Sequence, residues 1–120
     1  MEIRWLDVDV PTAGAQRPTR GAFEECAGGW RLALEYQAEG GETITVHFHG
    51  AAFSAWREAD ELEDWLQDGV CELMDSPWLP GLVTLGEIPD AAGLRHLQVH
   101  FPGHGLLDVA CTGFERVRGE

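Results

Sequence analysis

Hydrophobic and polar residues alternate in two stretches of the chain, and the first stretch predicts a hairpin. Residues 30–37 and 42–49 each place a large apolar side chain at every second position, which is the pattern of strands with one buried face. The turn between them is short, so we expect the two strands to pair antiparallel. We expect the second strand to bend at Gly50 and run on to about residue 57. The apolar face comprises Trp30, Leu32, Leu34, Tyr36, Ile44, Val46 and Phe48.

The second stretch, residues 94–111, predicts another hairpin around a P-G-H-G turn at 102–105. Its apolar residues Leu97, Val99 and Phe101 are expected to face the core, and the polar residues between them to face water. Shorter alternating segments predict a first strand at 2–10 and a further strand at 70–74. The polar face of the hairpin's first strand carries His96, Gln98 and His100.

One segment has helical periodicity instead. Leu62, Trp65 and Leu66 lie at i, i+3 and i+4, after a candidate N-cap at Asp60, which predicts a short helix at about 60–68. Loops are expected at 11–22 and turns at 76–81, because both segments are rich in proline and glycine. The fold class expected is therefore α+β. We expect a mainly antiparallel sheet of two hairpins and an N-terminal strand, curled or barrel-like, with one short helix.

The composition is that of one globular domain spanning residues 1–120, with 44% hydrophobic residues. No apolar run is long enough to cross a bilayer and the N-terminus does not resemble a signal peptide, so we expect a cytoplasmic protein and no membrane partner. Three widely spaced cysteines are odd in number and form no C-x-x-C pair. We expect them to be small buried residues and not disulfides.

The charge is strongly acidic, with 21 acids against 8 bases and a formal net charge of −13. Such a surface repels nucleic acid and attracts basic proteins. Eight of the acids lie between Glu58 and Asp75, a stretch without any base that also contains tryptophans able to anchor an interface. The candidate partner-binding residues are Glu61, Asp64, Asp68, Glu72 and Trp78.

Histidines suggest a second kind of site. His47-x-His49, preceded by Gly41, resembles the opening of the metal-binding motif of cupins, but Phe53 and Ser54 occupy the positions of the cupin glutamate. We expect no cofactor and expect these histidines to face water. The alternative is a divalent transition metal, which requires the two histidine-bearing strands to be neighbours. Its candidate ligands are His47, His49, His96 and His100.

No nucleophile motif is evident. Ser76 lies outside any G-x-S-x-G elbow, and Cys71 or Cys111 would meet a histidine only through the fold. The sequence therefore does not favour an enzyme.

The order of short motifs from His47 onward resembles that of a known family. F-H-G at 48–50, S-P-W-L at 76–79, H-L-Q-V-H-F at 96–101 and L-D-V at 107–109 are similar to motifs of small, acidic, uncharacterised bacterial proteins. Some of these are encoded near polymorphic toxins and suspected to be immunity proteins. The resemblance covers about residues 30–115 and implies a binding role.

The function expected is that of a non-enzymatic cytosolic binding protein, of the toxin-immunity type, whose acidic surface binds a basic protein partner such as a toxin. The first alternative is a cupin-like metal-binding protein or enzyme that uses His47 and His49. The second is a structural module that forms a homodimer through its sheet edges.

Overall fold

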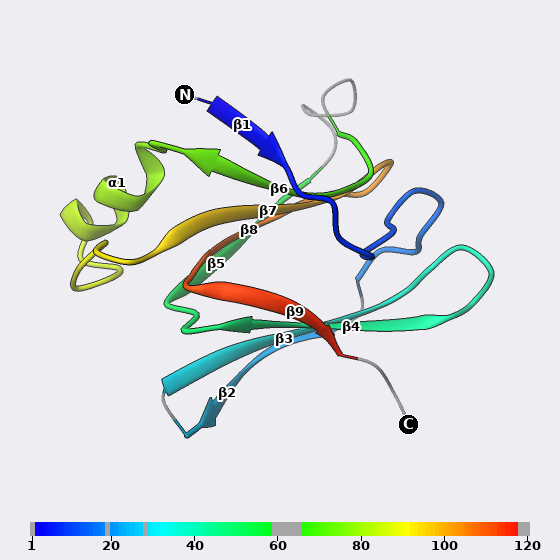
Figure 1. The fold of residues 1–120 in the computed structure, drawn as a ribbon, viewed down its shortest axis with the longest axis horizontal. Coiled ribbons are helices and arrows are strands. Elements are labelled where there is room, and N and C mark those ends of the chain that lie inside the picture. Colours follow the sequence, from blue (N-terminus) through cyan, green and yellow to red (C-terminus); the bar gives the residue numbers. More distant parts are fainter. Residues whose placement is uncertain (1, 19, 28, 59–65, 118–120) are drawn as a thin grey trace.

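The computed structural model describes residues 2–18, 20–27, 29–58 and 66–117. Within these ranges the chain forms two antiparallel sheets, the upper and lower layers of Figure 1. The five-stranded sheet contains, in spatial order, β1 (Glu2–Trp5), β6 (Gly69–Met74), β7 (Arg95–Phe101), β8 (Gly105–Cys111) and β5 (Phe53–Glu58). The four-stranded sheet contains β2 (Arg20–Cys26), β3 (Gly29–Gln37), β4 (Thr43–His49) and β9 (Gly113–Val117).

Both predicted hairpins are confirmed. β3 pairs with β4, with Leu34 opposite Val46, and β7 pairs with β8, with Gln98 opposite Asp108. The predicted strand at 70–74 is also confirmed as β6. These elements follow from local alternation joined by short turns.

The main core lies between the two sheets and is filled by their inward-facing apolar residues. The aromatic rings of Tyr36 and Phe101, one from each sheet, meet edge to face with centroids 5.1 Å apart. The Tyr36 hydroxyl donates to the carbonyl oxygen of Pro11 at 2.8 Å, which ties the loop after β1 to this core. The largest buried apolar side chains here are Tyr36, Ile44, Val46, Phe48, Leu97, Val99 and Phe101.

The prediction of one curled or barrel-like sheet is wrong, because the chain changes sheets at the end of β4. Gly50 has a φ of 59°, and a Cβ at this position would lie 2.6 Å from the Thr112 hydroxyl oxygen. This close approach requires glycine. The predicted bend at Gly50 is real, but it carries the chain into the five-stranded sheet, and β9 returns to the four-stranded sheet after Cys111.

Two predicted boundaries also differ from the structure. The strand predicted at 2–10 ends at Trp5, because the chain then turns so that Val10 is buried while Val8 is 42% exposed. The loop predicted at 11–22 ends earlier, because β2 begins at Arg20 as the edge strand beside β3.

The helix lies elsewhere than predicted. Most of the segment predicted at 60–68 lies outside the described residues, and 66–68 are not helical. Instead α1 (Trp78–Thr84) forms where turns were predicted, with Pro77 and Pro80 at its start. Proline is compatible with the first turn, where the missing N–H has no helical partner. No helix in the described part of the chain is both long and apolar enough to span a membrane.

Candidate functional site

Polar side chains are buried on the face of the five-stranded sheet that points away from the four-stranded sheet. The expectation that His96, Gln98 and His100 face water is wrong: they are 4%, 0% and 1% exposed. Alternation places them opposite the core residues of β7, as expected, but this second face is covered. The Trp78 ring of α1 lies over His96 with centroids 4.2 Å apart, and Trp5 of β1 contacts His100 edge to face at 5.0 Å.

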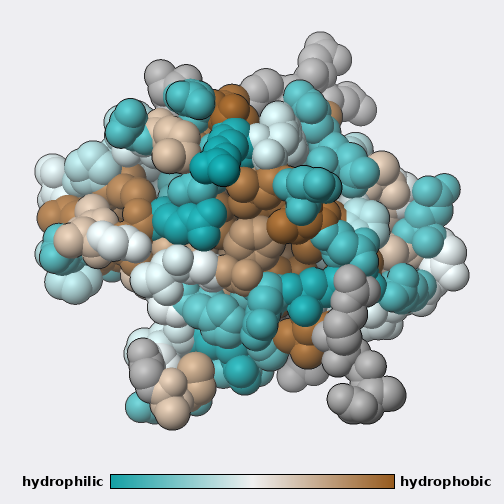
Figure 2. Space-filling view, viewed as in Figure 1, coloured by the Kyte–Doolittle hydropathy of each residue, from teal (hydrophilic) through white to brown (hydrophobic). Residues whose placement is uncertain are grey.

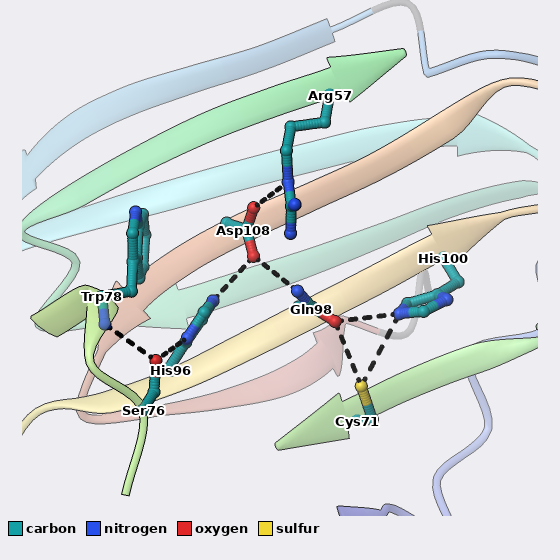
Figure 3. A network of polar contacts seen from close by, with 8 residues as sticks. All are labelled: Arg57, Cys71, Ser76, Trp78, His96, Gln98, His100 and Asp108. Atoms are coloured by element: carbon teal, nitrogen blue, oxygen red, sulfur yellow. Dashed lines mark hydrogen bonds and ion pairs between the residues drawn. The ribbon is translucent and has the colours of Figure 1, made fainter. Parts of the chain in front are cut away.

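The carboxylate of Asp108, on β8, is the centre of this polar network (Figure 3). Its Oδ1 accepts hydrogen bonds from His96 Nε2 at 2.6 Å and Gln98 Nε2 at 2.8 Å, and Oδ2 accepts from Arg57 Nε at 3.0 Å. Burial by itself raises the pKa of the Asp108 carboxyl. The hydrogen bonds from His96 and Gln98 and the charge of Arg57 outweigh burial and hold that pKa below its ordinary value. Asp108 is therefore an ionised, acceptor-only group at neutral pH.

The ionised carboxylate fixes the direction of the hydrogen bonds at His96. Because Asp108 only accepts, His96 Nε2 donates to it, and in the neutral imidazole with this tautomer Nδ1 is an acceptor. The Ser76 hydroxyl oxygen lies 2.7 Å from Nδ1 and itself accepts the backbone N–H of Trp78 at 3.1 Å. In that tautomer the Ser76 proton points to His96, and the His96 proton points to Asp108.

A second branch of the network runs through Gln98. Its Oε1 accepts from His100 Nε2 at 3.0 Å, and His100 Nδ1 accepts the backbone N–H of Gln67 at 3.3 Å. Burial lowers the pKa of His100 to about 4, so this imidazole is neutral at neutral pH. Cys71 Sγ lies 3.6 Å from Gln98 Oε1 and 3.7 Å from His100 Nε2. Burial raises the pKa of Cys71 to about 12, so Cys71 remains a thiol and is a poor nucleophile.

A surface pocket of about 310 Å³ opens beside the first branch. Ser76, which is 7% exposed, lines this pocket together with its hydrogen-bond partner His96. The other lining residues are Ala55, Arg57, Leu73, Pro77, Trp78 and Asp108. The arrangement gives a polarised hydroxyl access to a small cavity with polar and apolar walls.

The candidate metal ligands are not brought together. His47 and His49 lie on the outer face of the four-stranded sheet, with ring centroids 6.5 Å apart, and His49 Nε2 lies 3.2 Å from Glu115 Oε1. His96 and His100 lie on the outer face of the other sheet. Among the described residues, no group of three or more His, Cys, Asp or Glu is placed to hold a metal ion.

The candidate partner-binding residues divide into two groups. Glu61 and Asp64 lie outside the described residues. Asp68 accepts the N–H groups of Thr12 and Ala13 at 2.6 and 2.9 Å, and Glu72 is 8% exposed and paired with Arg95 at 2.8 Å. Trp78 is half-buried against His96. The described candidates therefore make contacts within the protein.

Sequence reasoning missed the contribution of Ser76, Gln98, Asp108 and Arg57. One signal was available: Asp108 is the only charged residue of the apolar strand β8, and the hairpin register places it opposite Gln98. A carboxylate in an otherwise apolar strand predicts a buried partner. Three of the motifs quoted for the family resemblance, S-P-W-L, H-L-Q-V-H-F and L-D-V, supply residues of the network.

No family model, curated protein or solved structure matches the chain. The function is therefore argued from the geometry and charge of the described residues.

Proposed function

We propose that this protein is a cytoplasmic binding protein of the toxin-immunity type, whose acidic surface binds a basic protein partner. The proposal rests on the excess of acids over bases and on the pairing of most described arginines with carboxylates of the same chain. Against 21 acids the chain has 8 bases, and in the described residues five arginines already pair with carboxylates. These pairs are Arg17–Glu58, Arg31–Glu24, Arg57–Asp108, Arg95–Glu72 and Arg116 with both Asp9 and Glu42.

This pairing has an electrostatic consequence. The five paired arginines cancel five negative charges, so acids remain in clear excess over bases. Outside these pairs, the described acids that face solvent include Glu2, Asp7, Glu25, Glu39, Asp75, Glu87 and Asp90. A single-sign surface of this kind raises the association rate of an oppositely charged protein and disfavours nucleic acid. The partner best matched to it is a basic protein.

An apolar centre for such an interface is present at α1. Leu85, directly after the helix, is 76% exposed, and Val83 is 36% exposed. The acids Glu87 and Asp90 follow on the exposed side of the same segment. Figure 2 shows apolar atoms over α1 at the left edge of the molecule. Exposed apolar side chains with a charged rim are typical of protein interfaces.

The test is binding to the product of the neighbouring gene, used as an inactive variant if it is toxic. We expect a complex whose dissociation constant rises at least tenfold between low salt and about 0.5 M salt, because screening weakens charge attraction. The double variant Leu85→Ser/Glu87→Gln should weaken binding about tenfold or more, measured by titration calorimetry.

A matched control is available on the other sheet. Trp30 is 52% exposed and lies opposite the exposed Glu25 in the β2–β3 register, so Trp30→Ser/Glu25→Gln removes the same kind of pair. This control should leave the affinity unchanged. A complex that is insensitive to salt, an equal loss in both double variants, or no binding to the neighbouring gene product would each contradict the proposal.

A further inference from the structure

Three side chains from separate segments form a hydrogen-bonded line that ends at the pocket. Ser76 follows β6, His96 lies on β7 and Asp108 on β8, and the two bonds that join them measure 2.7 and 2.6 Å. A hydroxyl bonded to one nitrogen of an imidazole, whose other nitrogen is held by a carboxylate, is the arrangement that activates serine nucleophiles. Such triads are recognised by geometry and roles, independently of fold and chain order. Here Nδ1 faces the hydroxyl and Nε2 faces the carboxylate.

The imidazole is held in one orientation. Trp78 covers its face at an interplanar angle of 32°. Asp108 cannot turn away from Nε2, because Gln98 and Arg57 hold both of its oxygens. Groups fixed in this way need no reorganisation when a proton moves.

The pocket beside Ser76 supplies what an acyl substrate needs. Its volume of about 310 Å³ is at the lower end of small-molecule sites. Leu73, Pro77 and Trp78 give it an apolar wall. The Arg57 side chain lines the same pocket and is 48% exposed. Asp108 accepts from its Nε, and a guanidinium has further N–H donors that can bind an oxyanion.

We propose that Ser76 is a nucleophile for acyl transfer, with His96 as its general base, and that the pocket accepts a small carboxylic ester. Ser76 Oγ bonds to the carbonyl carbon while its proton passes to His96 Nδ1. The ester C–O bond then breaks, and His96 returns that proton to the leaving alcohol. Water attacks the acyl-serine in the same way, releasing the carboxylic acid and restoring the hydroxyl. Asp108 is a positioning residue. This activity is independent of the proposed binding function.

The experiment is covalent trapping of the full chain with a fluorophosphonate, followed by peptide mapping, together with hydrolysis of p-nitrophenyl acetate. We expect one adduct, on Ser76, and loss of hydrolysis in the trapped protein. Ser76→Ala should remove both the adduct and the hydrolysis. His96→Gln should slow both by about 10²- to 10⁴-fold, the usual contribution of a general base.

The sequence contains a matched control, because its only other serine is Ser54. Ser54 lies on β5 and lines a different cavity, between the sheets. Ser54→Ala should leave labelling and hydrolysis unchanged.

The labelling of the wild-type protein decides the question even if a variant fails to fold. No adduct on the folded wild-type chain, or hydrolysis that survives in a folded Ser76→Ala variant, would overturn the proposal. Ser76 would then serve only to join the start of α1 to β7.

Discussion

The two sheets carry similar histidine patterns on their outer faces and treat them in opposite ways. On the four-stranded sheet the His49 side chain is 45% exposed and its partner Glu115 is 63% exposed. On the five-stranded sheet the side chains of His96 and its partner Asp108 are each 4% exposed. The strands themselves do not explain this difference, since both alternate in the same way. What differs is that α1 and Trp5 pack over the outer face of the five-stranded sheet and exclude water from it.

Burial beneath other side chains changes what a polar pair contributes to the free energy of unfolding. An exposed polar pair such as His49–Glu115 contributes at most about 1 kcal/mol, because water competes for both partners. A buried carboxylate with three donors behaves differently. Removing its charge leaves buried donors poorly satisfied, and breaking such a pair costs about 3–5 kcal/mol.

The largest expected effect is therefore on the free energy of unfolding when Asp108 is changed. Asp108→Asn keeps the shape but replaces an oxygen by an NH₂ that cannot accept from His96, Gln98 or Arg57. We expect a loss of about 3–5 kcal/mol, measured by urea denaturation followed through tryptophan fluorescence. Glu115→Gln on the other sheet is the matched change and should alter stability by no more than about 0.5 kcal/mol. Equal losses of stability in the two variants would show that burial does not govern the difference between Asp108 and Glu115.

The next effect is a pH dependence that belongs to His100. Its folded pKa of about 4 lies below its ordinary value of 6.5, so the unfolded chain binds a proton that the folded chain does not. The contribution to stability is complete above pH 6.5 and is lost progressively as the pH falls toward 4. The slope is at most about 1.4 kcal/mol per pH unit. The carboxyls of Asp68, Glu72 and Asp108, whose pKa values are also lowered, add their losses below about pH 5.

His100→Gln should flatten this decline between about pH 6.5 and 5, because the substituted side chain does not titrate. His47→Gln is the control on the exposed face. Its pKa is also lowered, by partial burial and then by the charge of Arg31, but its contribution is screened by solvent. Urea denaturation at several pH values measures both variants. The opposite result, in which His47→Gln removes most of the slope of the unfolding free energy with pH and His100→Gln removes little, would contradict the idea that the buried face dominates.

The two hairpins could be predicted from the sequence, but the change of sheet and the position of the helix could not. The β3–β4 and β7–β8 hairpins follow from alternation and short turns, so they are predictable. The change of sheet at Gly50 depends on contact with Thr112, which is distant in sequence. Helix α1 was missed because prolines suit both turns and first helical turns. The alternation correctly grouped His96 with His100, but whether their face met water depended on α1 and Trp5.

The smallest expected effect is that of metal on the exposed face, where the sequence offered His47 and His49. Two imidazoles with ring centroids 6.5 Å apart form an incomplete zinc site, which needs three or four protein ligands. We expect millimolar Zn²⁺ to stabilise the protein by less than about 0.5 kcal/mol, the value for a ligand near its dissociation constant. His47→Gln/His49→Gln should remove that small shift in a thermal melt. His100→Gln should leave it intact, because His100 lies under cover on the other sheet. Two results together would contradict this expectation: a larger stabilisation that His47→Gln/His49→Gln abolishes, and a stoichiometric metal content by elemental analysis. They would mean that the exposed histidine pair recruits further ligands. The exposed face of a sheet could then hold a site as specific as the buried one.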